Sequence, residues 1–253
     1  MLVIIFTNTG LDRKFNEDAV LAGDIFQGFL MEAPMVATEP GFLVAVADGM
    51  GGGPGGAQAS KIVLEALKEL PEFSPESDHR DLLVNCLNLA SQKLNSLGLG
   101  QPQLVGLGST VAGLWRKGDS ATIFNCGDCR VYRSRRGSVD LLSRDHSTVY
   151  NLYLEGLISF EDIRHHPQRH LITSAIQGGS TVNIEVFTRK VLLKNGDLFL
   201  ICSDGVWESI DGDLLEQCLS DGEPELAALR LMACLEESKV GDDHSFLLHK
   251  VIS

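Results

Sequence analysis

The stretch "VADGMGGGPGGAQAS", from Val46 to Ser60, decides how the chain is interpreted. An apolar run ends at one aspartate, Asp48, and a glycine-rich loop then leads into a helix-forming segment. A phosphate-cradling P-loop is excluded here, because that motif places a lysine directly after its last glycine. The first lysine after this loop is Lys61, which comes too late.

Three interpretations of the loop stay open on this stretch alone. Gly51, Gly53 and Gly56 satisfy the G-x-G-x-x-G spacing of dinucleotide-binding loops. A flexible turn without chemistry is the second interpretation. In the third, Asp48 is a metal ligand at the end of a buried strand, and Gly49 turns its carbonyl towards the same ion. The rest of the chain has to discriminate among them.

Charge and hydropathy narrow the classes of protein. The 253 residues include 21 Lys plus Arg against 34 Asp plus Glu, a formal net charge of −13. Nucleic-acid-binding proteins normally present a basic surface, so no nucleic-acid partner is expected. The excess Asp and Glu residues either lie on a solvated surface or cluster to bind cations. No apolar run approaches the ~20 residues of a membrane span, and no signal peptide is evident, so we expect no membrane association and a cytoplasmic location.

The six cysteines are expected to stay reduced, because the chain is large and carries no secretion signal. Cys126 and Cys129 form a single C-x-x-C pair. A zinc site needs further Cys or His ligands at matching spacing, and a redox motif would open a helix. The neighbours of this pair instead indicate two strands that meet at a turn, so both functions are disfavoured.

The order of predicted elements indicates the fold class. Short apolar or β-branched segments predict strands at 2–6, 19–22, 42–47, 110–115, 121–126, 131–134, 183–188, 198–202 and 245–251. Helices are predicted at 57–70, 80–97, 212–220 and 224–238. Strands come in adjacent groups and helices in adjacent pairs, which favours an α+β class with antiparallel sheets over a doubly wound parallel sheet. The dinucleotide interpretation becomes weaker for the same reason. No linker or repeat divides the chain, so residues 1–253 are expected to form one domain.

Aspartates recur where strongly apolar strands end or begin: Asp48, Asp128, Asp204 and the pair Asp242–Asp243. Stacked sheets bring strand ends to one rim, and carboxylates that converge there repel one another unless cations neutralise them. An oxygen donor set without a His or Cys cluster selects Mg²⁺ or Mn²⁺ over Zn²⁺.

The segment "GLDRKFNEDA" adds Glu17 and Asp18 to this set, with Arg13 a few residues upstream. A guanidinium fork donates paired hydrogen bonds to phosphate oxygens. The combination predicts metal-assisted hydrolysis of a phosphate ester. A surface ion pair with Asp12 or Glu17 is the alternative role for Arg13.

Taken in order, the motifs resemble those of the metal-dependent serine/threonine protein phosphatases, called PPM or type 2C. They cover nearly the whole chain: "GLDRKFNED", "VADGMGGGPGGAQAS", "GST" at 108–110, "GDCRVYR" at 127–133, "DHS" at 145–147, "HPQRHLITSAI" at 166–176, "DLFLICSDGVWESI" at 197–210 and "GDDHSF" at 241–246. The resemblance implies a bacterial-type, single-domain member. It also implies a four-layer α-β-β-α sandwich of two antiparallel sheets flanked by helix pairs, with a short flap subdomain at about 148–168.

The resemblance also implies roles for single residues. Asp48 would bridge two Mn²⁺ or Mg²⁺ ions, and the Gly49 carbonyl would join one of them. Glu17 would serve the second ion and Asp18 would hold coordinated waters. The remaining implied roles are as follows: Asp204 and Asp242 complete the shell of the first ion, Arg13 takes the phosphate, and Asp128 binds a possible third ion. A water between the two principal ions would attack phosphorus without a covalent phosphoenzyme.

Several positions depart from the family pattern. Met50 and Gly53 stand where members of the family carry histidines, so the general acid is unassigned between a water on the metals and His146. Asp243 stands where an asparagine is usual, which leaves either Asp242 or Asp243 as the ligand.

Two further predictions concern side chains outside this set. Within the flap and its end, His165 and His166 are expected to be ordinary polar residues. Trp115 and Trp207 are expected in the core.

The hypothesis favoured by the sequence is an active phosphoserine and phosphothreonine phosphatase. A catalytically silent phosphoprotein-binding regulator of the same fold is the alternative, and it would be expected to have lost metal ligands. An oxidoreductase rests only on the glycine pattern. We expect the partner to be a soluble phosphoprotein made by a Ser/Thr kinase, and the protein to be a monomer.

Overall fold

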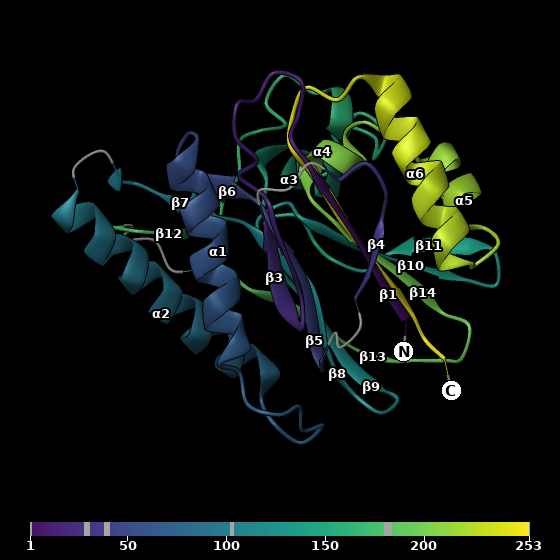
Figure 1. The fold of residues 1–253 in the computed structure, drawn as a ribbon, viewed down its shortest axis with the longest axis horizontal. Helices are drawn as coiled ribbons and strands as arrows, with labels where there is room; N and C mark the ends of the chain where they lie inside the picture. The colour runs from purple at the N-terminus through teal and green to yellow at the C-terminus, as the bar shows by residue number, and fades with distance from the viewer. Residues whose placement is uncertain (1, 28–30, 38–40, 102–103, 180–183, 253) are drawn as a thin grey trace.

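Two six-stranded antiparallel β-sheets stack face to face, and a pair of helices covers the outer face of each sheet (Figure 1). The computed structural model describes residues 1–253 except 1, 28–30, 38–40, 102–103, 180–183 and 253. The predicted α+β class and the four-layer α-β-β-α sandwich are therefore confirmed.

The first sheet has the strand order β11-β10-β14-β15-β1-β4, and all its neighbouring strands are antiparallel. Its strands are β1 (Leu2–Asn8), β4 (Met35–Ala37), β10 (Arg130–Arg135), β11 (Ser138–Leu141), β14 (Leu198–Cys202) and β15 (His244–Lys250). The N-terminal strand β1 thus pairs with the C-terminal strand β15, which brings the two ends of the chain together (Figure 1).

The second sheet has the order β13-β9-β8-β5-β2-β3 and is also antiparallel. Its strands are β2 (Ala19–Ala22), β3 (Asp24–Gln27), β5 (Leu43–Ala47), β8 (Val111–Lys117), β9 (Ser120–Cys126) and β13 (Phe187–Leu192). A small third sheet, β12-β7-β6, is built from two-residue strands: β6 (Gly49–Met50), β7 (Gly108–Ser109) and β12 (Ile176–Gln177).

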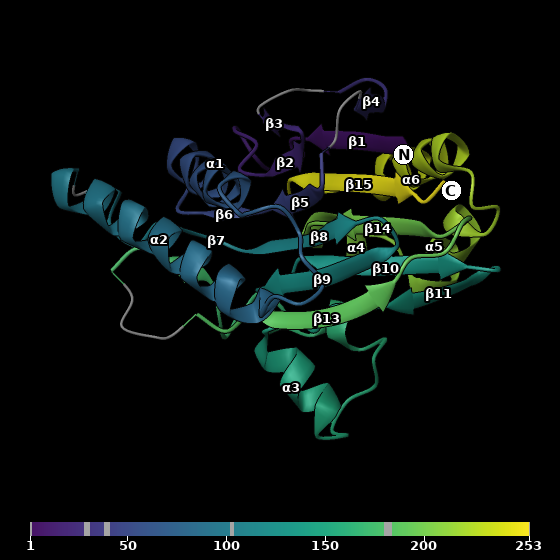
Figure 2. The same ribbon diagram turned by 90° about the horizontal axis from the view of Figure 1, so that it is seen from below.

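The helices divide into two outer layers and a set of short ones. Their bounds are α1 (Pro54–Lys68), α2 (His79–Gly100), α3 (Thr148–Leu154), α4 (Asp204–Trp207), α5 (Gly212–Leu219), α6 (Pro224–Ser238) and the 3₁₀ turn η2 (Ile163–His165). Helices α1 and α2 pack on the second sheet, and α5 and α6 pack on the first (Figures 1 and 2). Among the helices that the structure describes, none has both the length and the apolar character that a membrane crossing requires.

Burial on both faces explains why the central strands are continuous apolar runs rather than alternating ones. In β5, Leu43, Ala45 and Ala47 face the α1–α2 layer, whereas Val44 and Val46 face the first sheet. Strand β14 divides its side chains between α5–α6 and the second sheet in the same way. Because both faces are filled with apolar side chains, the first polar residue after each of these strands marks a rim of the sandwich.

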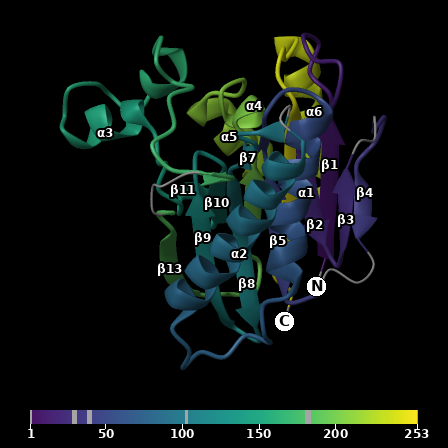
Figure 3. The ribbon, with the colours of Figure 1, turned by 90° about the vertical axis from the view of Figure 1, so that its left-hand side faces the viewer.

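The segment predicted to be a flap, residues 148–168, follows β11 and contains α3 and η2. Figures 2 and 3 show α3 standing out from the layers. The flap is anchored at its base by a β-bridge between Ser147 and Ile172 and by the Ser147 hydroxyl, which caps α3. Val149, Tyr150 and Ile163 are buried in the same core as α5 and α6, so the flap packs on the first sheet's side of the molecule.

Some predicted boundaries were wrong. The strand expected at 183–188 is β13 at Phe187–Leu192, where it pairs with β9 at the sheet edge; Asn183 lies outside the described residues. Helix α1 begins at Pro54 rather than Ala57, because Gly53 takes the cap position and proline suits the first helical turn. The two-residue strands of the third sheet and the short helices α3 and α4 were not predicted from the sequence.

Candidate active site

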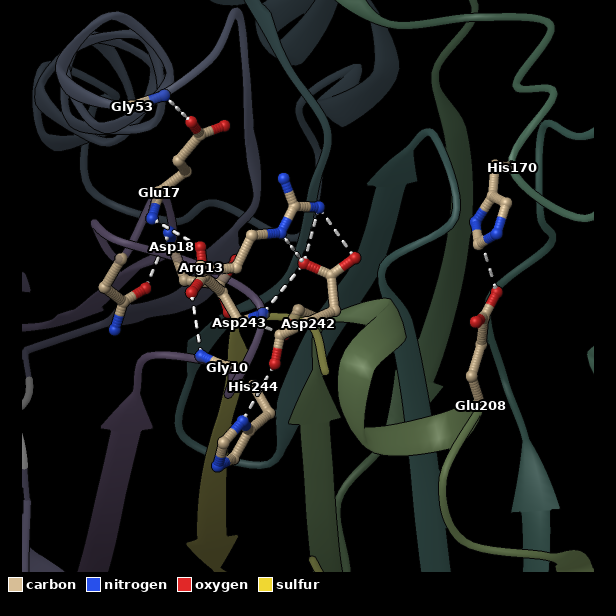
Figure 4. Close-up of polar contacts among 12 residues, drawn as sticks. Gly10, Arg13, Glu17, Asp18, Gly53, His170, Glu208, Asp242, Asp243 and His244 are labelled. Atoms are coloured by element: carbon tan, nitrogen blue, oxygen red, sulfur yellow. Dashed lines mark hydrogen bonds and ion pairs between the residues drawn. The ribbon is translucent and has the colours of Figure 1, made fainter. Parts of the chain in front are cut away.

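The glycine-rich loop brings the start of α1 against a carboxylate. The Gly53 amide donates to the Glu17 Oε1 atom (Figure 4). A side chain at Gly56 would overlap the other oxygen of Glu17, and one at Gly49 would overlap the Gly56 carbonyl. Gly53 also has a φ of 67°, a conformation that glycine adopts without strain. The glycines are therefore needed so that backbone and Glu17 pack closely beside the end of β5.

Asp48 follows β5 directly and is held in place through its backbone. Its carbonyl oxygen accepts from the Thr110 amide and from the Ser109 hydroxyl, both at 2.8 Å. Gly49 opens β6, and its amide donates to the Glu17 carbonyl oxygen at 3.2 Å. The side chain of Asp48 is thereby directed by two neighbouring strands rather than by a flexible turn.

Asp18 is completely buried beside this strand end. The Ser203 hydroxyl donates to its Oδ2 atom at 2.7 Å, whereas Oδ1 has no hydrogen-bond partner among the described residues. Burial raises the pKa of Asp18 to about 7, against the opposing effect of hydrogen bonds from Ser245 and Ser203. A buried carboxylate oxygen without a partner is costly, so it needs a water or a cation beside it.

Asp204 begins α4 immediately after β14 and Ser203. Burial raises its pKa well above the ordinary value, and the charges of Asp128 and Asp242 raise it further. For Asp48 the pKa is likewise raised by burial and next by the charge of Asp204. Charges act on a pKa only over short distances, so Asp48, Asp204, Asp128 and Asp242 lie near one another and the structure brings together strand ends that are far apart in the sequence.

Asp128 lies in the turn between β9 and β10 and is buried. Burial raises its pKa to about 7, and the charge of Asp145 adds to the shift. The Trp207 Nε1 donates to the Asp128 carbonyl oxygen at 2.9 Å, which fixes the turn from the side of α4. The predicted core position of Trp207 is confirmed, and so is that of Trp115, which is fully buried.

Arg13 and Asp242 form a two-armed ion pair (Figure 4). The Arg13 Nε and Nη2 atoms each lie 2.8 Å from a different oxygen of Asp242. This hydrogen bond is the main cause of a raised pKa for Arg13, and burial opposes it. The alternative partners predicted for Arg13, Asp12 and Glu17, were wrong, because the loop before β15 places Asp242 directly under the guanidinium.

Asp243 has a different role from Asp242. Its two oxygens accept from the backbone amides of Gly10 at 3.1 Å and Glu17 at 2.8 Å. Asp243 is buried, whereas the Asp242 side chain is 36% exposed. Asp243, which stands where an asparagine is usual, therefore serves to bind backbone amides. This difference favours Asp242 as the cation ligand, because its oxygens contact an exchangeable guanidinium whereas those of Asp243 are held by backbone amides.

His146 has a structural contact that the sequence did not predict. Its Nδ1 accepts from the Gly127 amide at 3.1 Å, next to Asp128. The ring is buried, and burial lowers the pKa of His146, so the neutral imidazole is favoured. This arrangement argues for a part in holding the Asp128 turn and against proton donation to a bound substrate.

Sequence reasoning missed a buried charge network behind Asp128. The Arg130 guanidinium lies 3.7 Å from the ring centroid of Trp207 and donates to both oxygens of Asp145. It also donates to the Tyr132 hydroxyl at 3.0 Å. The alternation of β10 would have placed Arg130 on a buried face, which is the one signal in the sequence that could have found it.

The C-x-x-C pair does not form a site. Cys126 belongs to the core between α1–α2 and the second sheet, whereas Cys129 belongs to the core between the two sheets. Their thiols contact different hydroxyls, those of Ser174 and Thr110. The prediction of free thiols at these positions is confirmed.

The donor set suits hard divalent cations. Burial raises the pKa of Asp48 and of Asp204, and the charges of Asp18 and Asp128 raise both further; an oxygen of Asp18 lacks a partner among the described residues. Such a cluster is stable in its ionised form only when cations offset the repulsion. Oxygen ligands of this kind bind Mg²⁺ or Mn²⁺, so the residues fit the predicted ions.

Known proteins are similar to this chain in sequence and in fold. A family model described as Protein phosphatase 2C matches residues 33–237. The serine/threonine protein phosphatase PstP of Mycobacterium tuberculosis is 30% identical over 226 residues, which cover 89% of this chain and 40% of PstP. The serine/threonine phosphatase stp of Listeria monocytogenes is 29% identical over 217 residues, covering 84% of this chain and 81% of that protein.

Solved structures agree with these matches. The crystal structure of M. tuberculosis PstP has a TM-score of 0.83 and 27% sequence identity, with full coverage of both chains. The PstP catalytic domain in complex with two manganese ions has a TM-score of 0.79 at 26% identity, again with full coverage of both chains. The sandwich with a carboxylate-lined rim defines a metal-dependent phosphatase fold. The chain belongs to the protein phosphatase 2C family, which confirms the resemblance found in the sequence. It spans 40% of the length of the M. tuberculosis relatives that it matches.

Proposed function

We propose that this chain is a protein serine/threonine phosphatase that hydrolyses phosphoserine and phosphothreonine esters with Mn²⁺ or Mg²⁺. The observation that carries the proposal is the convergence of Asp48, Asp204, Asp18 and Asp128 at one rim of the sandwich, where carboxylate charges raise the pKa values of Asp48 and Asp204. Membership in the family, and the two manganese ions named for the PstP catalytic domain, support the same conclusion. The carboxylate set is complete, so a silent phosphoprotein-binding regulator is not favoured.

We assign the ligands as the resemblance implies. Asp48 would hold both principal ions, and Asp204 and Asp242 would serve the first of them together with the Gly49 carbonyl. Glu17 would serve the second ion, Asp18 would hold waters of the site, and Asp128 would serve a third ion. When bound, the ions supply positive charge to the phosphate and lower the pKa of a water that attacks phosphorus.

The chain's own residues set the geometry of this reaction. Hydrogen bonds from Ser109 and Thr110 fix the backbone of Asp48. The hydroxyl of Ser203, the residue before Asp204, orients the carboxylate of Asp18. The amide contacts of Asp243 keep Glu17 and the Arg13 loop in place behind these groups. The carboxylates are thereby positioned before the substrate arrives, which reduces the cost of organising the site.

Arg13 binds the substrate phosphate in this proposal. In the structure its fork occupies both oxygens of Asp242, so Asp242 has to release Arg13 when it takes a cation. The freed guanidinium then offers the same pair of donors to two phosphate oxygens. Arg13 is 44% exposed on its side chain, which leaves it accessible to a peptide substrate.

The partner is proposed to be a phosphoprotein made by a Ser/Thr kinase of the same cell. Monomeric state and a cytoplasmic location stay predictions from the sequence. The single-domain organisation of residues 1–253, with the flap at 148–168, also stays a prediction.

Turnover of a phosphothreonine peptide and of p-nitrophenyl phosphate by the purified chain, with added Mn²⁺, tests the function. We expect hydrolysis of both compounds with Mn²⁺ and none after exhaustive chelation. Binding of the phosphopeptide without hydrolysis, at any Mn²⁺ concentration, would instead support the silent regulator.

A further inference from the structure

A cavity of about 310 Å³ lies between the flap and the start of α5. Its floor is apolar and largely aromatic, and the side chains that form it are buried or half-buried: Tyr132, Phe160, Trp207, Ile210 and Leu215. These side chains belong to one apolar core cluster but come from β10, the flap, α4 and α5. The cavity is therefore formed where the flap packs against the two helices.

The rim of this cavity is acidic. Four exposed carboxylates line it: Glu161, Asp162, Asp211 and Asp213. Two of them come from the flap and two from the N-terminal end of α5, so both walls of the cavity carry negative charge.

Two of the four acids already have partners, and two do not. Asp162 accepts from the amide and the hydroxyl of Ser159, and Asp211 caps the first turn of α5. Glu161 and Asp213 have no hydrogen bond or ion pair with any residue that the structure describes. These two carboxylates are available to a ligand, and they stand on different walls.

Two arginines also line the cavity, but the acids stay in excess. The Arg130 guanidinium donates to both oxygens of Asp145, which lies behind the cavity floor and offsets its charge. Arg164 offsets the charge of one rim acid, and its Nε donates to the His165 Nε2 atom at 3.0 Å. The net charge of −13 on the whole chain adds a field that attracts cations.

The cavity adjoins the proposed phosphate site. Arg164 and His165 line both this cavity and a polar cavity of about 550 Å³ that contains Arg13. On the floor, the Trp207 Nε1 donates to the carbonyl oxygen of Asp128, one of the rim acids of the active site, at 2.9 Å. One peptide can therefore place its phosphoryl group at Arg13 and a neighbouring side chain in the acidic cavity.

We propose that this cavity binds an arginine or lysine side chain that lies close in sequence to the phosphorylated residue of the substrate. The aliphatic part of such a side chain packs on the aromatic floor, and its cationic end contacts Glu161 and Asp213. The inference rests on the proposed function and adds to it a preference for substrates with basic residues beside the phosphate. Glu161 and Asp213 are thus specificity residues, outside the set that would hold the ions.

Steady-state kinetics on matched phosphothreonine peptides tests the cavity. The peptides differ in one flanking residue, which is Ala, Arg or Glu, placed in turn at each position on both sides of the phosphothreonine. For the wild type we expect the best Arg peptide to exceed its Ala counterpart by about tenfold in kcat/KM, mainly through KM, and the Glu counterpart to be slower. p-Nitrophenyl phosphate has no flanking residues, so it reports the chemistry without the cavity.

The double variant Glu161→Gln with Asp213→Asn removes both available charges and keeps the size of the side chains. We expect its preference for the Arg peptide to fall below about threefold, with unchanged turnover of p-nitrophenyl phosphate. Glu155→Gln with Glu216→Gln is the matched control, because it removes the same charge from exposed positions of the flap and of α5 that do not line the cavity. This control should keep the full preference.

Equal kcat/KM for the Arg and Ala peptides in the wild type would overturn the proposal, and so would a preference for Glu peptides. An Arg preference that the cavity variant retains would overturn it as well. If the wild type with Mn²⁺ does not hydrolyse p-nitrophenyl phosphate, the proposed function fails. Fluorescence anisotropy of labelled peptides, which needs no turnover, then decides the cavity through the same comparisons.

Discussion

Two regions of this protein bury acidic side chains, and they do so in opposite ways. Behind the Asp128 turn, Asp145 is fully buried but receives three hydrogen bonds from Arg130, whose charge offsets its own. At the rim, Asp48, Asp204 and Asp18 face other carboxylates, and burial and charge raise their pKa values. A buried acid that is paired with an arginine is part of the scaffold, whereas acids that converge without a basic partner form a site suited to cations.

The largest expected effect comes from the rim. Asp48→Asn keeps the shape of the side chain and removes one charge from the bridging ligand, so we expect turnover to fall by more than about a thousandfold at saturating Mn²⁺. The metal-free variant should melt at the same or a higher temperature than the wild type, because carboxylate repulsion falls. Phosphopeptide kinetics and melting curves measure the two effects. Retention of a tenth of the wild-type rate would exclude Asp48 as the bridge.

A change in the buried pair of Arg130 and Asp145 should lower the stability of the protein and leave turnover largely intact. Asp145→Asn leaves the Arg130 guanidinium buried without its counter-charge, and we expect a loss of about 3 kcal/mol in the free energy of unfolding. Denaturant unfolding of the metal-free protein measures it. The rate per folded molecule should change much less than in Asp48→Asn. A stability equal to that of the wild type would remove the distinction between the two regions.

Arg13→Ala is expected to have a smaller effect than either change. It removes a proposed phosphate contact and no metal ligand, so KM for a phosphopeptide should rise by about tenfold, with a minor loss in kcat. The same variant frees both oxygens of Asp242, so its affinity for Mn²⁺ should be equal to or above that of the wild type. Unchanged kinetics would mean that Arg13 serves only the ion pair with Asp242.

A pH dependence of stability is also expected at the rim. Folding raises the pKa of Asp18 from its ordinary value of 3.8 to about 7, so between these two values the folded chain binds a proton that the unfolded chain has released. The stabilising proton is in place below about pH 4 and is lost as the pH rises towards 7. Metal-free wild type should therefore lose up to about 1.4 kcal/mol per pH unit relative to Asp18→Asn.

The comparison with Asp18→Asn is needed because buried histidines change the folding stability with pH in the opposite direction. Burial lowers the pKa of His249 to about 3, and such a group makes the folded state more stable as the pH rises. Both proteins contain His249, so the difference between them isolates Asp18. Parallel stability curves for the two proteins between pH 4 and pH 7 would contradict a raised pKa at Asp18.

The layers of the fold were predictable from the sequence because the central strands are long apolar runs with an aspartate at the end. The run before Asp48 has both faces buried, and helix α6 was predicted with its observed bounds, Pro224–Ser238. The two-residue strands were not predictable, since so short a segment carries no periodicity. Their pairing depends on backbone contacts between distant segments.

The site was predictable in its residue types and not in its contacts. Asp48, Asp204 and Asp242 stand out as acids at strand boundaries, but the partner of Arg13 lies 229 residues away along the chain. Neither spacing nor composition could give that pair, nor the hydrogen bond from Trp207 to the Asp128 carbonyl. Both depend on how loops from different layers converge at the rim, which is a property of the folded chain.

The most direct test of the carboxylate rim as a two-ion site is electron paramagnetic resonance of bound Mn²⁺, read together with the binding stoichiometry. Two ions that share the Asp48 carboxylate would lie roughly 3.5–4 Å apart and interact magnetically. We expect at least two Mn²⁺ per wild-type chain with an exchange-coupled spectrum, and loss of that coupling in Asp48→Asn. A single uncoupled Mn²⁺ in the wild type, or the same coupled spectrum in both proteins, would contradict the assignment of Asp48 as the bridging ligand.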